Sequence, residues 1–344
     1  MNEPLNIHDY EQLARERLPE NAWEYLRGGA GDETTLRANR AAFERWELRP
    51  RVLVDVAGVS TATNVLGHEI ALPVVVAPLA LQKLFDAEGE AATARAARDA
   101  GTIMCLSTSA TMLPRAVAEA APGGRLWFQV YVFRDRGTTS ALIEEASDAG
   151  YSALVLTVDT PLLGRREGTL RIGFTGVPDE LEVAGDIFGN LDASVSWRDL
   201  EWIAGYGLPV VLKGVLTADD ARLGVEHGAA AIVVSNHGGR QLDGVPATID
   251  ALPEVVEAVD GRCEVLLDSG VRRGVDVLRA LALGARAVLC GRAVMYGLGA
   301  AGEDGARHAL ELLREEVALG LQLLGCASPA DVTRTHVALR AWSG

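Results

Sequence analysis

Residues 231–244 read Ala231-Ile232-Val233-Val234-Ser235-Asn236-His237-Gly238-Gly239-Arg240-Gln241-Leu242-Asp243-Gly244. The first four form an uninterrupted, mostly β-branched apolar run, which is typical of a parallel strand buried on both faces. The loop that follows combines a titratable base, a fixed cation and two conformationally permissive glycines. This combination suits a small carboxylic acid, because Arg240 can clamp a carboxylate while His237 accepts a proton nearby.

Similar apolar runs recur along the chain and predict eight strands, at 72–77, 102–106, 126–131, 153–158, 208–212, 231–234, 264–267 and 286–289. Helical patterns fill the gaps, for example at 88–100 and at 217–226, where Thr217 begins a capping-box-like turn. Eight strand–helix alternations favour an α/β fold of the (β/α)8, or TIM, barrel type. An open doubly wound sheet is the alternative, but the GxGxxG turn that would favour it does not follow the first run.

Two segments lie outside this repeat, within what we expect to be a single domain over residues 1–344. Residues 1–70 precede the first strand and carry helical patterns at 9–16 and 20–25, which predicts an N-terminal helical cap across the barrel. The fourth and fifth strands begin 55 residues apart, at 153 and 208. Because this spacing is longer than that between the other strands, it predicts a lid-like insertion at 164–197, at the end of the barrel where such lids form. The second half of this insertion also reads as flexible filler.

Composition narrows the class of protein. The chain has 344 residues, 49% of them hydrophobic, and a formal net charge of −15. This charge argues against nucleic acid as a partner, so an anionic substrate must be attracted by a local basic site. The chain has no apolar stretch of eighteen residues and no secretory pattern at its N-terminus, so we expect a soluble protein without a membrane segment. Four cysteines without a CxxC pair favour a reducing cytoplasm, and we expect no metal site.

Polar side chains gather where the predicted strands end. In a barrel these ends and the loops after them carry the active site. The residues there are Pro78, Ser107, Gln129, Tyr131, Thr157, Asp159, Lys213, His237, Arg240, Asp268, Arg272, Gly291 and Arg292. They predict a catalytic site at this end of the barrel.

Individual residues of this set have both functional and structural interpretations. A lone histidine in a loop is often only a satisfied loop residue, but a carboxylate such as Asp159 facing His237 would make it a stabilised base. Lys213 ends a buried strand and needs an anionic partner, which a developing charge on a cofactor would supply. The glycine-containing turns at 268–274 and 290–292 follow the last two strands, where barrels often bind phosphate. Tyr25 and Tyr131 are either hydrogen-bond donors to a substrate or packing residues.

Several motifs together extend over nearly the whole chain. They are Tyr25, 37–40, Gly67, Pro73, 77–78, 88–90, Thr157-Val158-Asp159-Thr160-Pro161, 235–243 and 291–292. With these motifs the chain resembles the FMN-dependent L-2-hydroxy acid oxidases and dehydrogenases, a family that includes glycolate, lactate and mandelate oxidases.

The resemblance implies a role for each matching position. His237 would be the active-site base, Asp159 its carboxylate partner, and Tyr131 the contact to the reacting end of the substrate. Arg240 and Tyr25 would hold the substrate carboxylate, with Arg166 as a second cation. Lys213 would lie near flavin N1. The remaining cofactor positions would be Ala77, Pro78, Leu79, Ser107, Gln129, Thr157 and Ser235 around the ring, and Asp268, Gly270, Arg272, Gly291 and Arg292 around the ribityl phosphate.

The chain departs from the family pattern at two positions that bear on the substrate and the electron acceptor. Ser109 stands where glycolate oxidase-like members carry a tryptophan, which implies a wider pocket, and we count Ser109 among the substrate-binding residues. Leu79 replaces the small or hydroxylated residue usual after Ala-Pro, which bears on reactivity with O2. The insertion after the fourth strand is also shorter than in glycolate oxidase.

The resemblance therefore implies oxidation of an L-2-hydroxy acid bulkier than glycolate, mandelate-like or long-chain, to the 2-oxo acid. Reoxidation by O2 would give H2O2, and transfer to a quinone or protein acceptor is the alternative. Whether the α-hydrogen leaves as a hydride or after a carbanion stays open. A non-catalytic flavin-binding barrel is the alternative from another class. A barrel of the isopentenyl diphosphate isomerase kind is disfavoured by His237 and Arg240. The family typically forms homotetramers or octamers.

Overall fold

The computed structural model describes residues 3–174 and 189–340. Eight parallel strands form a closed barrel, in which the last strand pairs with the first. The strands are β4 (Val74–Val76), β5 (Ile103–Leu106), β6 (Arg125–Val130), β7 (Leu154–Thr157), β8 (Val210–Val215), β9 (Ala231–Val234), β10 (Glu264–Leu267) and β11 (Ala287–Cys290). Each corresponds to one predicted run, so the sequence prediction of a (β/α)8 barrel is confirmed.

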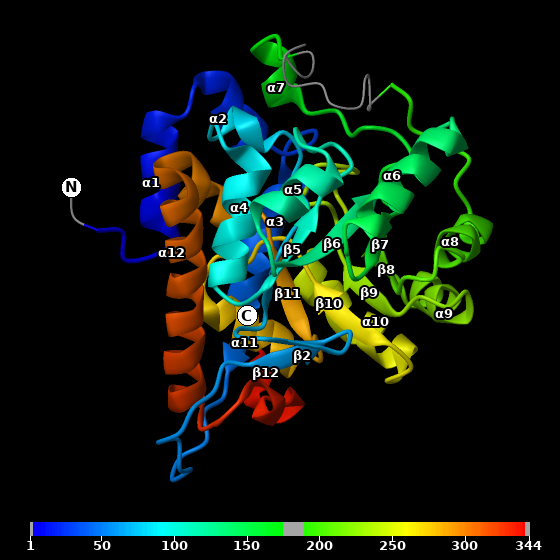
Figure 1. The fold of residues 1–344 in the computed structure, drawn as a ribbon. Helices are drawn as coiled ribbons and strands as arrows, with labels where there is room; N and C mark the ends of the chain where they lie inside the picture. Colours follow the sequence, from blue (N-terminus) through cyan, green and yellow to red (C-terminus); the bar gives the residue numbers. More distant parts are fainter. Residues whose placement is uncertain (1–2, 175–188, 341–344) are drawn as a thin grey trace.

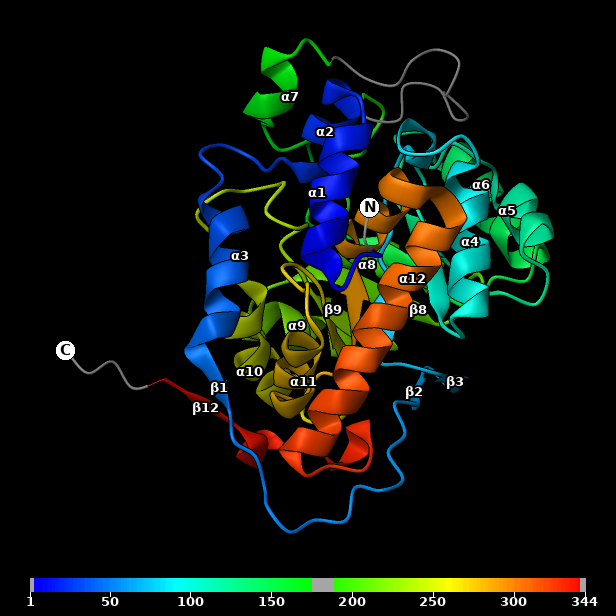
Figure 2. The same cartoon turned by 90° about the vertical axis from the view of Figure 1, so that its left-hand side faces the viewer.

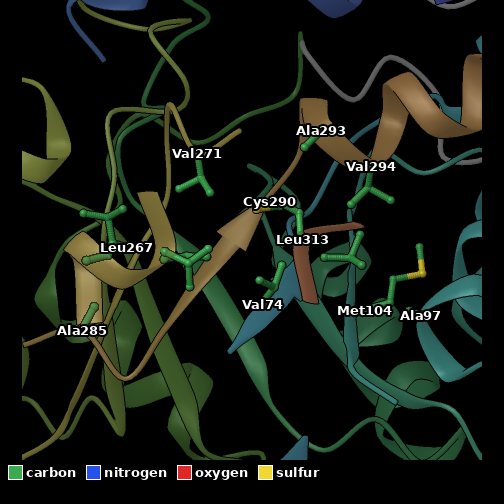
Figure 3. Close-up of a cluster of buried hydrophobic side chains, with 14 of the residues drawn as sticks. Val74, Ala97, Met104, Leu267, Val271, Ala285, Cys290, Ala293, Val294 and Leu313 are labelled. Atoms are coloured by element: carbon green, nitrogen blue, oxygen red, sulfur yellow. The ribbon is translucent and has the colours of Figure 1, made fainter. Parts of the chain in front are cut away.

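Alternate residues of each strand enter two different cores, because side chains on a strand point to opposite faces in turn. Val75, Cys105 and Val233 pack inside the barrel. Their neighbours face the surrounding helices instead. Figure 3 shows Val74 and Met104 from two strands beside side chains contributed by helices, such as Leu313. This double burial explains why the strands read as continuous apolar runs.

Helices follow the strands and surround the barrel (Figure 1). They are α4 (Gly89–Asp99), α5 (Pro114–Ala120), α6 (Arg136–Asp148), α8 (Trp197–Ala204), α9 (Ala218–Glu226), α10 (Thr248–Val259), α11 (Gly274–Ala282) and α12 (Arg292–Leu324). The helices predicted at 88–100 and 217–226 are present as α4 and α9. At the start of α9 the Thr217 side chain accepts a hydrogen bond from the Asp220 backbone N–H, as its capping pattern predicts.

The N-terminal segment is helical only in its first part. It begins with α1 (Ile7–Arg17), α2 (Glu20–Arg27) and α3 (Thr34–Arg45). Residues 46–70 contain the short strands β1 (Trp46–Leu48), β2 (Thr63–Val65) and β3 (His68–Ile70), which the sequence interpretation did not include. β1 pairs with β12 (Val337–Leu339) near the end of the chain.

The β2–β3 hairpin closes the N-terminal end of the barrel. Val65 and Ile70 are buried among the barrel-interior side chains. The backbone N–H of Leu66 donates to Glu264 Oε2 at the start of β10 (3.1 Å). Short 3-10 helices lie at η1 (Gln82–Leu84), η3 (Pro329–Asp331) and η4 (Arg334–His336).

The segment between β7 and β8 contains α7 (Glu167–Arg171), which lies beside α2 at the end of the molecule away from the β2–β3 hairpin (Figure 2). Residues 175–188 of the predicted lid-like insertion lie outside the described residues. The first part is fastened at two points: Gly164 N–H donates to Gln241 Oε1 and Gly31 N–H donates to the carbonyl of Arg165. No helix among the described residues is long and apolar enough to span a membrane.

Candidate active site

A pocket opens at the carboxyl ends of the barrel strands and encloses about 910 Å³ of empty space, part of it open to solvent. All of the site residues predicted from the sequence line it except Asp159 and Ser235, which lie directly behind it. The predicted residues that line it are Tyr25, Ala77, Pro78, Leu79, Ser107, Ser109, Gln129, Tyr131, Thr157, Arg166, Lys213, His237, Arg240, Asp268, Gly270, Arg272, Gly291 and Arg292. The structure thus brings residues from α2 and from all eight strand ends into one cavity.

His237 is held on both sides of its imidazole ring. Nδ1 lies 2.8 Å from Asp159 Oδ1 and 3.3 Å from the Thr160 hydroxyl. The Nδ1–H therefore donates to the carboxylate, and Nε2 is left as the proton acceptor on the pocket side. The Tyr131 hydroxyl lies 3.4 Å from Nε2. This is the geometry of a base whose tautomer is fixed by a carboxylate.

The backbone at His237 has a φ of 59°, in the left-handed region that is unusual for a residue with a side chain. Such strain persists only where the surroundings hold it. Here the His237 N–H donates to Ser235 Oγ (3.1 Å), and the next glycine donates to Ser269 Oγ (2.9 Å). The loop thus turns the imidazole into the pocket.

Burial controls the protonation of the base and its partner. Burial lowers the pKa of His237, and the facing carboxylate of Asp159 offsets only part of this effect. The pKa of Asp159 stays below its usual value although burial acts to raise it, because His237 and Lys213 favour its ionised form. Burial raises the pKa of Tyr131 to about 12, so its phenol remains a hydrogen-bond donor. The resting site therefore holds a neutral imidazole ready to accept a proton.

Arg240 is a cation without an anionic partner among the described residues. Its Nη1 donates to the carbonyl oxygens of Tyr25 (2.7 Å) and Gly28 (3.0 Å). The guanidinium also lies over the Tyr25 ring, 4.8 Å from its centroid. Burial and the nearby Arg166 lower the pKa of Arg240 well below its usual value. Because these contacts leave the positive charge uncompensated, the position favours an anionic ligand.

Lys213, by contrast, already has an anionic partner. Its Nζ lies 3.0 Å from Asp268 Oδ2 and donates to Ser235 Oγ at 3.0 Å. Burial opposes its charge, but the attraction of Asp268 and Asp159 raises the pKa of Lys213. The sequence interpretation expected a cofactor charge to supply this partner, whereas the structure shows that Asp268 does so. Lys213 is therefore charged and in place before any ligand binds.

Arg292 begins α12 and is a second cation for which the described part of the chain offers no ion-pair partner. It donates to the carbonyls of Leu26 (2.8 Å), Gly28 (2.8 Å) and Gly238 (3.0 Å). Burial lowers the pKa of Arg292 to about 10, so the guanidinium stays charged at neutral pH. Arg272 lies nearby over the Tyr296 ring. Two arginines beside the N-terminus of α12, whose first helical stretch ends at a kink at Ala301 and Gly302, make a suitable site for a phosphate group.

Comparisons with known proteins decide the family. A sequence profile of the FMN-dependent dehydrogenases matches residues 14–339. The chain belongs to the FMN-dependent dehydrogenase family. It is an oxidoreductase, and its cofactor is FMN.

Relatives within the family are oxidases of 2-hydroxy acids. The chain is 48% identical over 360 residues to glycolate oxidase 5 of Oryza sativa subsp. japonica, covering 99% of this chain and 97% of that protein. It is 47% identical over 365 residues to the L-lactate oxidase of a Nostoc species, covering 98% and 99%. A solved mandelate oxidase structure superposes with a TM-score of 0.93 at 46% identity, and 98% of each chain is covered. A mandelate oxidase structure solved with benzoyl-formic acid superposes with a TM-score of 0.92 at 46% sequence identity, and 98% of each chain is again covered.

The pocket of this family member fits FMN on observations of its own atoms. Gln129 Nε2 and Thr157 Oγ1 are buried beside the cavity without a hydrogen-bond partner in the described structure. A flavin ring has the ring nitrogens and carbonyl oxygens that such groups need. Gly270, at a φ of 91°, leaves no room for a side chain, since a Cβ there would lie 2.4 Å from the Asn39 carbonyl oxygen. Gln129 and Thr157 would thus hold the ring, and Gly270, Arg272 and Arg292 the phosphate end.

Several residues that line or support the pocket were not assigned a site role from the sequence. Leu26, Ala80, Gly238, Ser269, Val271, Leu289 and Cys290 also line the pocket. Thr160 and Gln241 support it from behind, since Gln241 Nε2 donates to the carbonyls of Asp159 and Leu162. Gly238, Gln241 and Thr160 lie within the most specific motifs and could have been inferred from them. Leu26 carries no sequence signal, because only the folding of α2 over the barrel places it there. No group of His, Cys, Asp and Glu in the described parts of the chain could hold a metal ion.

Proposed function

We propose that the protein oxidises an L-2-hydroxy acid bulkier than glycolate, mandelate-like or long-chain, to the 2-oxo acid, and that O2 is reduced to H2O2 in the same cycle. The observation that carries this proposal is the pairing of Arg240 and His237 on one loop. A buried guanidinium without a carboxylate partner in the described structure lies three residues from a neutral imidazole that faces the same cavity.

The chain's own residues supply binding and proton transfer. The substrate carboxylate would lie against Arg240, with Tyr25 beside it, because a bidentate charge-assisted contact fixes both position and orientation. His237 Nε2 would then accept the proton of the 2-hydroxyl group. Asp159 would stabilise the resulting imidazolium through the hydrogen bond to Nδ1. FMN bound in the pocket supplies the acceptor for the two electrons that leave the α-carbon.

The size of the accepted side chain is inferred from Ser109. This residue is 1% exposed, lines the pocket, and its hydroxyl has no hydrogen-bond partner in the described structure. A small residue at this position leaves space that a large aromatic one would fill. Among the solved structures similar to this chain are mandelate oxidases, one with 3,3-difluoro-2-hydroxy-3-phenylpropionic acid. Both observations support a bulky side chain.

Anaerobic stopped-flow measurement of flavin bleaching tests the proposal. Wild-type protein is mixed with glycolate, lactate, mandelate and a long-chain 2-hydroxy acid, and bleaching is expected to be fastest with one of the last two. His237→Ala should keep its flavin spectrum while reduction slows by about 10²–10⁴-fold. The proposal is wrong if no hydroxy acid bleaches the flavin, since a flavin-binding barrel without catalysis would behave in this way.

A quinone- or protein-linked dehydrogenase is the second candidate, and Leu79 favours it. Leu79 lines the pocket and its side chain lies against Gly291, where a Cβ would meet Leu79 Cδ1 at 2.9 Å. A bulky aliphatic side chain there restricts the space open to a small oxidant. Oxygen consumption with H2O2 release on adding substrate supports the oxidase. Rapid bleaching followed by slow reoxidation in air supports the dehydrogenase.

A further inference from the structure

We infer that Glu90 is a positioning residue that fixes the pocket wall formed by Leu79 and Ser109, and that it thereby sets which substrate side chain the enzyme accepts. Glu90 lies in the first turn of α4 and does not line the pocket. It therefore acts only through other residues. The inference rests on the proposed function, because it concerns selectivity among 2-hydroxy acids.

Glu90 is fully buried and contacts two loops at once. Its Oε1 accepts hydrogen bonds from the backbone N–H groups of Gln82 (3.1 Å) and Thr111 (2.9 Å). Its Oε2 accepts a hydrogen bond from the Thr111 hydroxyl. Glu90 is 0% exposed and forms no ion pair with a Lys, Arg or His of the described residues. Its partners therefore belong to the loops after β4 and β5 and to no other part of the described structure.

The loop after β4 carries Leu79 and is under backbone strain. Leu81 has a φ of 60°, in the left-handed region, which is costly for a residue with a branched side chain. Glu90 holds the next backbone N–H, that of Gln82. The Gln82 side chain in turn donates from Nε2 to the Leu79 carbonyl (3.3 Å) and accepts from the Thr93 hydroxyl (2.6 Å). The contact with Glu90 therefore maintains the turn that places Leu79 in the pocket.

The loop after β5 carries Ser109 and is joined to the first loop directly. The Leu81 N–H donates to the Ser109 carbonyl (3.1 Å). Glu90 accepts from Gln82, which follows Leu81, and from Thr111, which lies two residues after Ser109. The Leu81–Ser109 bond and these two contacts of Glu90 together form a closed ring of hydrogen bonds that joins the two loops. Leu79 and Ser109, the departures from the family pattern that bear on the electron acceptor and the substrate, thus depend on one carboxyl group for their relative position.

The burial of the Glu90 carboxyl group argues that this residue does more than fill space in the packing of α4. A buried carboxyl group without a cationic partner is costly unless its oxygens are fully used, and an apolar residue would pack α4 at lower cost. Here both oxygens accept hydrogen bonds, and the start of a helix favours negative charge. The group serves to hold two backbone N–H groups that an apolar residue would leave unpaired.

The test compares Glu90→Ala with Glu90→Gln and a matched control. Glu264→Ala is the control, because the Glu264 carboxylate likewise accepts a backbone N–H at a turn with a positive-φ leucine. Its donor is the N–H of Leu66 itself, at the opposite end of the barrel, whereas Glu90 accepts from Gln82, the residue after Leu81. The readout is the ratio of kcat/KM for mandelate to kcat/KM for glycolate, measured beside the melting temperature and the flavin spectrum.

For Glu90→Ala we expect this ratio to change by roughly tenfold or more, mainly through KM, because small displacements of pocket groups have large effects on positioning. Glu90→Gln keeps an oxygen for the backbone N–H groups and should restore most of the wild-type ratio. Glu264→Ala should lower the melting temperature and leave the ratio unchanged. An unchanged ratio in flavin-loaded Glu90→Ala would overturn the inference.

Two further measurements keep the inference testable. If Glu90→Ala does not fold, Thr111→Val replaces it, since this variant removes one hydroxyl contact of Glu90 and keeps the backbone N–H; an unchanged ratio in that variant contradicts the inference. If no acid reduces the wild-type flavin, the proposed function fails on its own. The kinetic ratio is then replaced by the ratio of the Kd values for acetate and phenylacetate, each measured from the change in flavin absorbance on binding. An equal ratio in wild type and Glu90→Ala would overturn the role of Glu90.

Discussion

At the scale of single residues, proton transfer depends on the pKa of His237, on which burial and the hydrogen bond to Asp159 have opposite effects. His237 loses solvation in the pocket, which lowers its pKa, while the 2.8 Å contact with Asp159 favours its protonated form. The outcome is an imidazole that is neutral before the reaction and stabilised once it has accepted a proton. A more exposed histidine would be protonated more readily and would be a poorer base near neutral pH.

The pH dependence of flavin reduction follows from this balance. Only the neutral imidazole accepts a proton, so kcat/KM should fall as the pH drops through the pKa of His237, which burial holds below the usual value of a histidine. Asp159→Asn removes the main influence that raises this pKa. The acidic limb should therefore move to still lower pH, and the plateau rate should fall because the imidazolium loses its partner. The check is a pH profile of anaerobic flavin reduction for both proteins; an acidic limb that moves to higher pH in Asp159→Asn would contradict the assignment.

Ser109 leads to a second prediction at this scale. Ser109→Trp should fill the buried space beside the flavin position and lower kcat/KM for mandelate by at least tenfold relative to glycolate, since a steric clash disfavours the larger acid. Ser109→Ala keeps the size and removes the hydroxyl, so its substrate profile should stay close to that of wild type. Steady-state kinetics over the same panel of acids checks both variants, and an unchanged profile in Ser109→Trp would show that Ser109 does not bound the substrate space.

At the scale of elements, the site depends on contacts between segments far apart in the chain. The segment before α7 is joined to the His237 loop, because Gly164 N–H donates to Gln241 Oε1. The loop after α2 bonds to the same segment through Gly31 and to the loop after β9 through Ala30, whose N–H donates to the Gly239 carbonyl. These contacts bring α2, α7 and the loop after β9 together around the substrate position.

A substitution at Gly164 should separate these elements. A Cβ at this position would lie 2.3 Å from the Arg240 carbonyl oxygen and 2.7 Å from Gln241 Cα, and neither backbone group can move away alone. Gly164→Ala should therefore displace Arg240 and raise KM by roughly tenfold, while the flavin spectrum is retained. Gly58→Ala is the matched control, because a Cβ there meets nothing within 4 Å. Steady-state kinetics that do not differ between the two variants would show that Gly164 has no influence on the substrate clamp.

At the scale of the whole molecule, an acidic protein contains a cationic pocket. The net charge is −15, yet Arg240 and Arg292 lie in the cavity without carboxylate partners among the described residues. Each buried, uncompensated charge opposes folding of the empty protein. Anionic ligands should therefore contribute to stability as well as to function.

Cofactor removal should show this effect. A ligand present at about 100 times its Kd stabilises the folded state by about 2.7 kcal/mol, so FMN should raise the melting temperature of the apoprotein by several degrees. Riboflavin lacks the phosphate and should raise it less. Arg292→Gln should reduce the difference between the two ligands. Thermal melts of apoprotein, with and without each ligand, make the comparison; equal shifts with FMN and riboflavin in wild type would place the phosphate away from Arg292.

The sequence by itself determined the barrel and the set of chemical groups at its active end. Continuous β-branched runs such as 231–234 indicate a strand that is buried on both faces. The polar residues that follow each run indicate where the strand ends. Both are local properties of the chain, so they are readable without a structure. The family resemblance added the cofactor and the reaction type in the same way, from local motifs.

Only the tertiary structure decided which groups meet. Asp159 and His237 are 78 positions apart in the chain, and their contact exists because β7 and β9 end at the same face of a closed barrel. The partner of Lys213 proved to be Asp268, and the β2–β3 hairpin proved to close the other end of the barrel. Pairing between side chains far apart in sequence depends on barrel closure and packing, which no local pattern encodes.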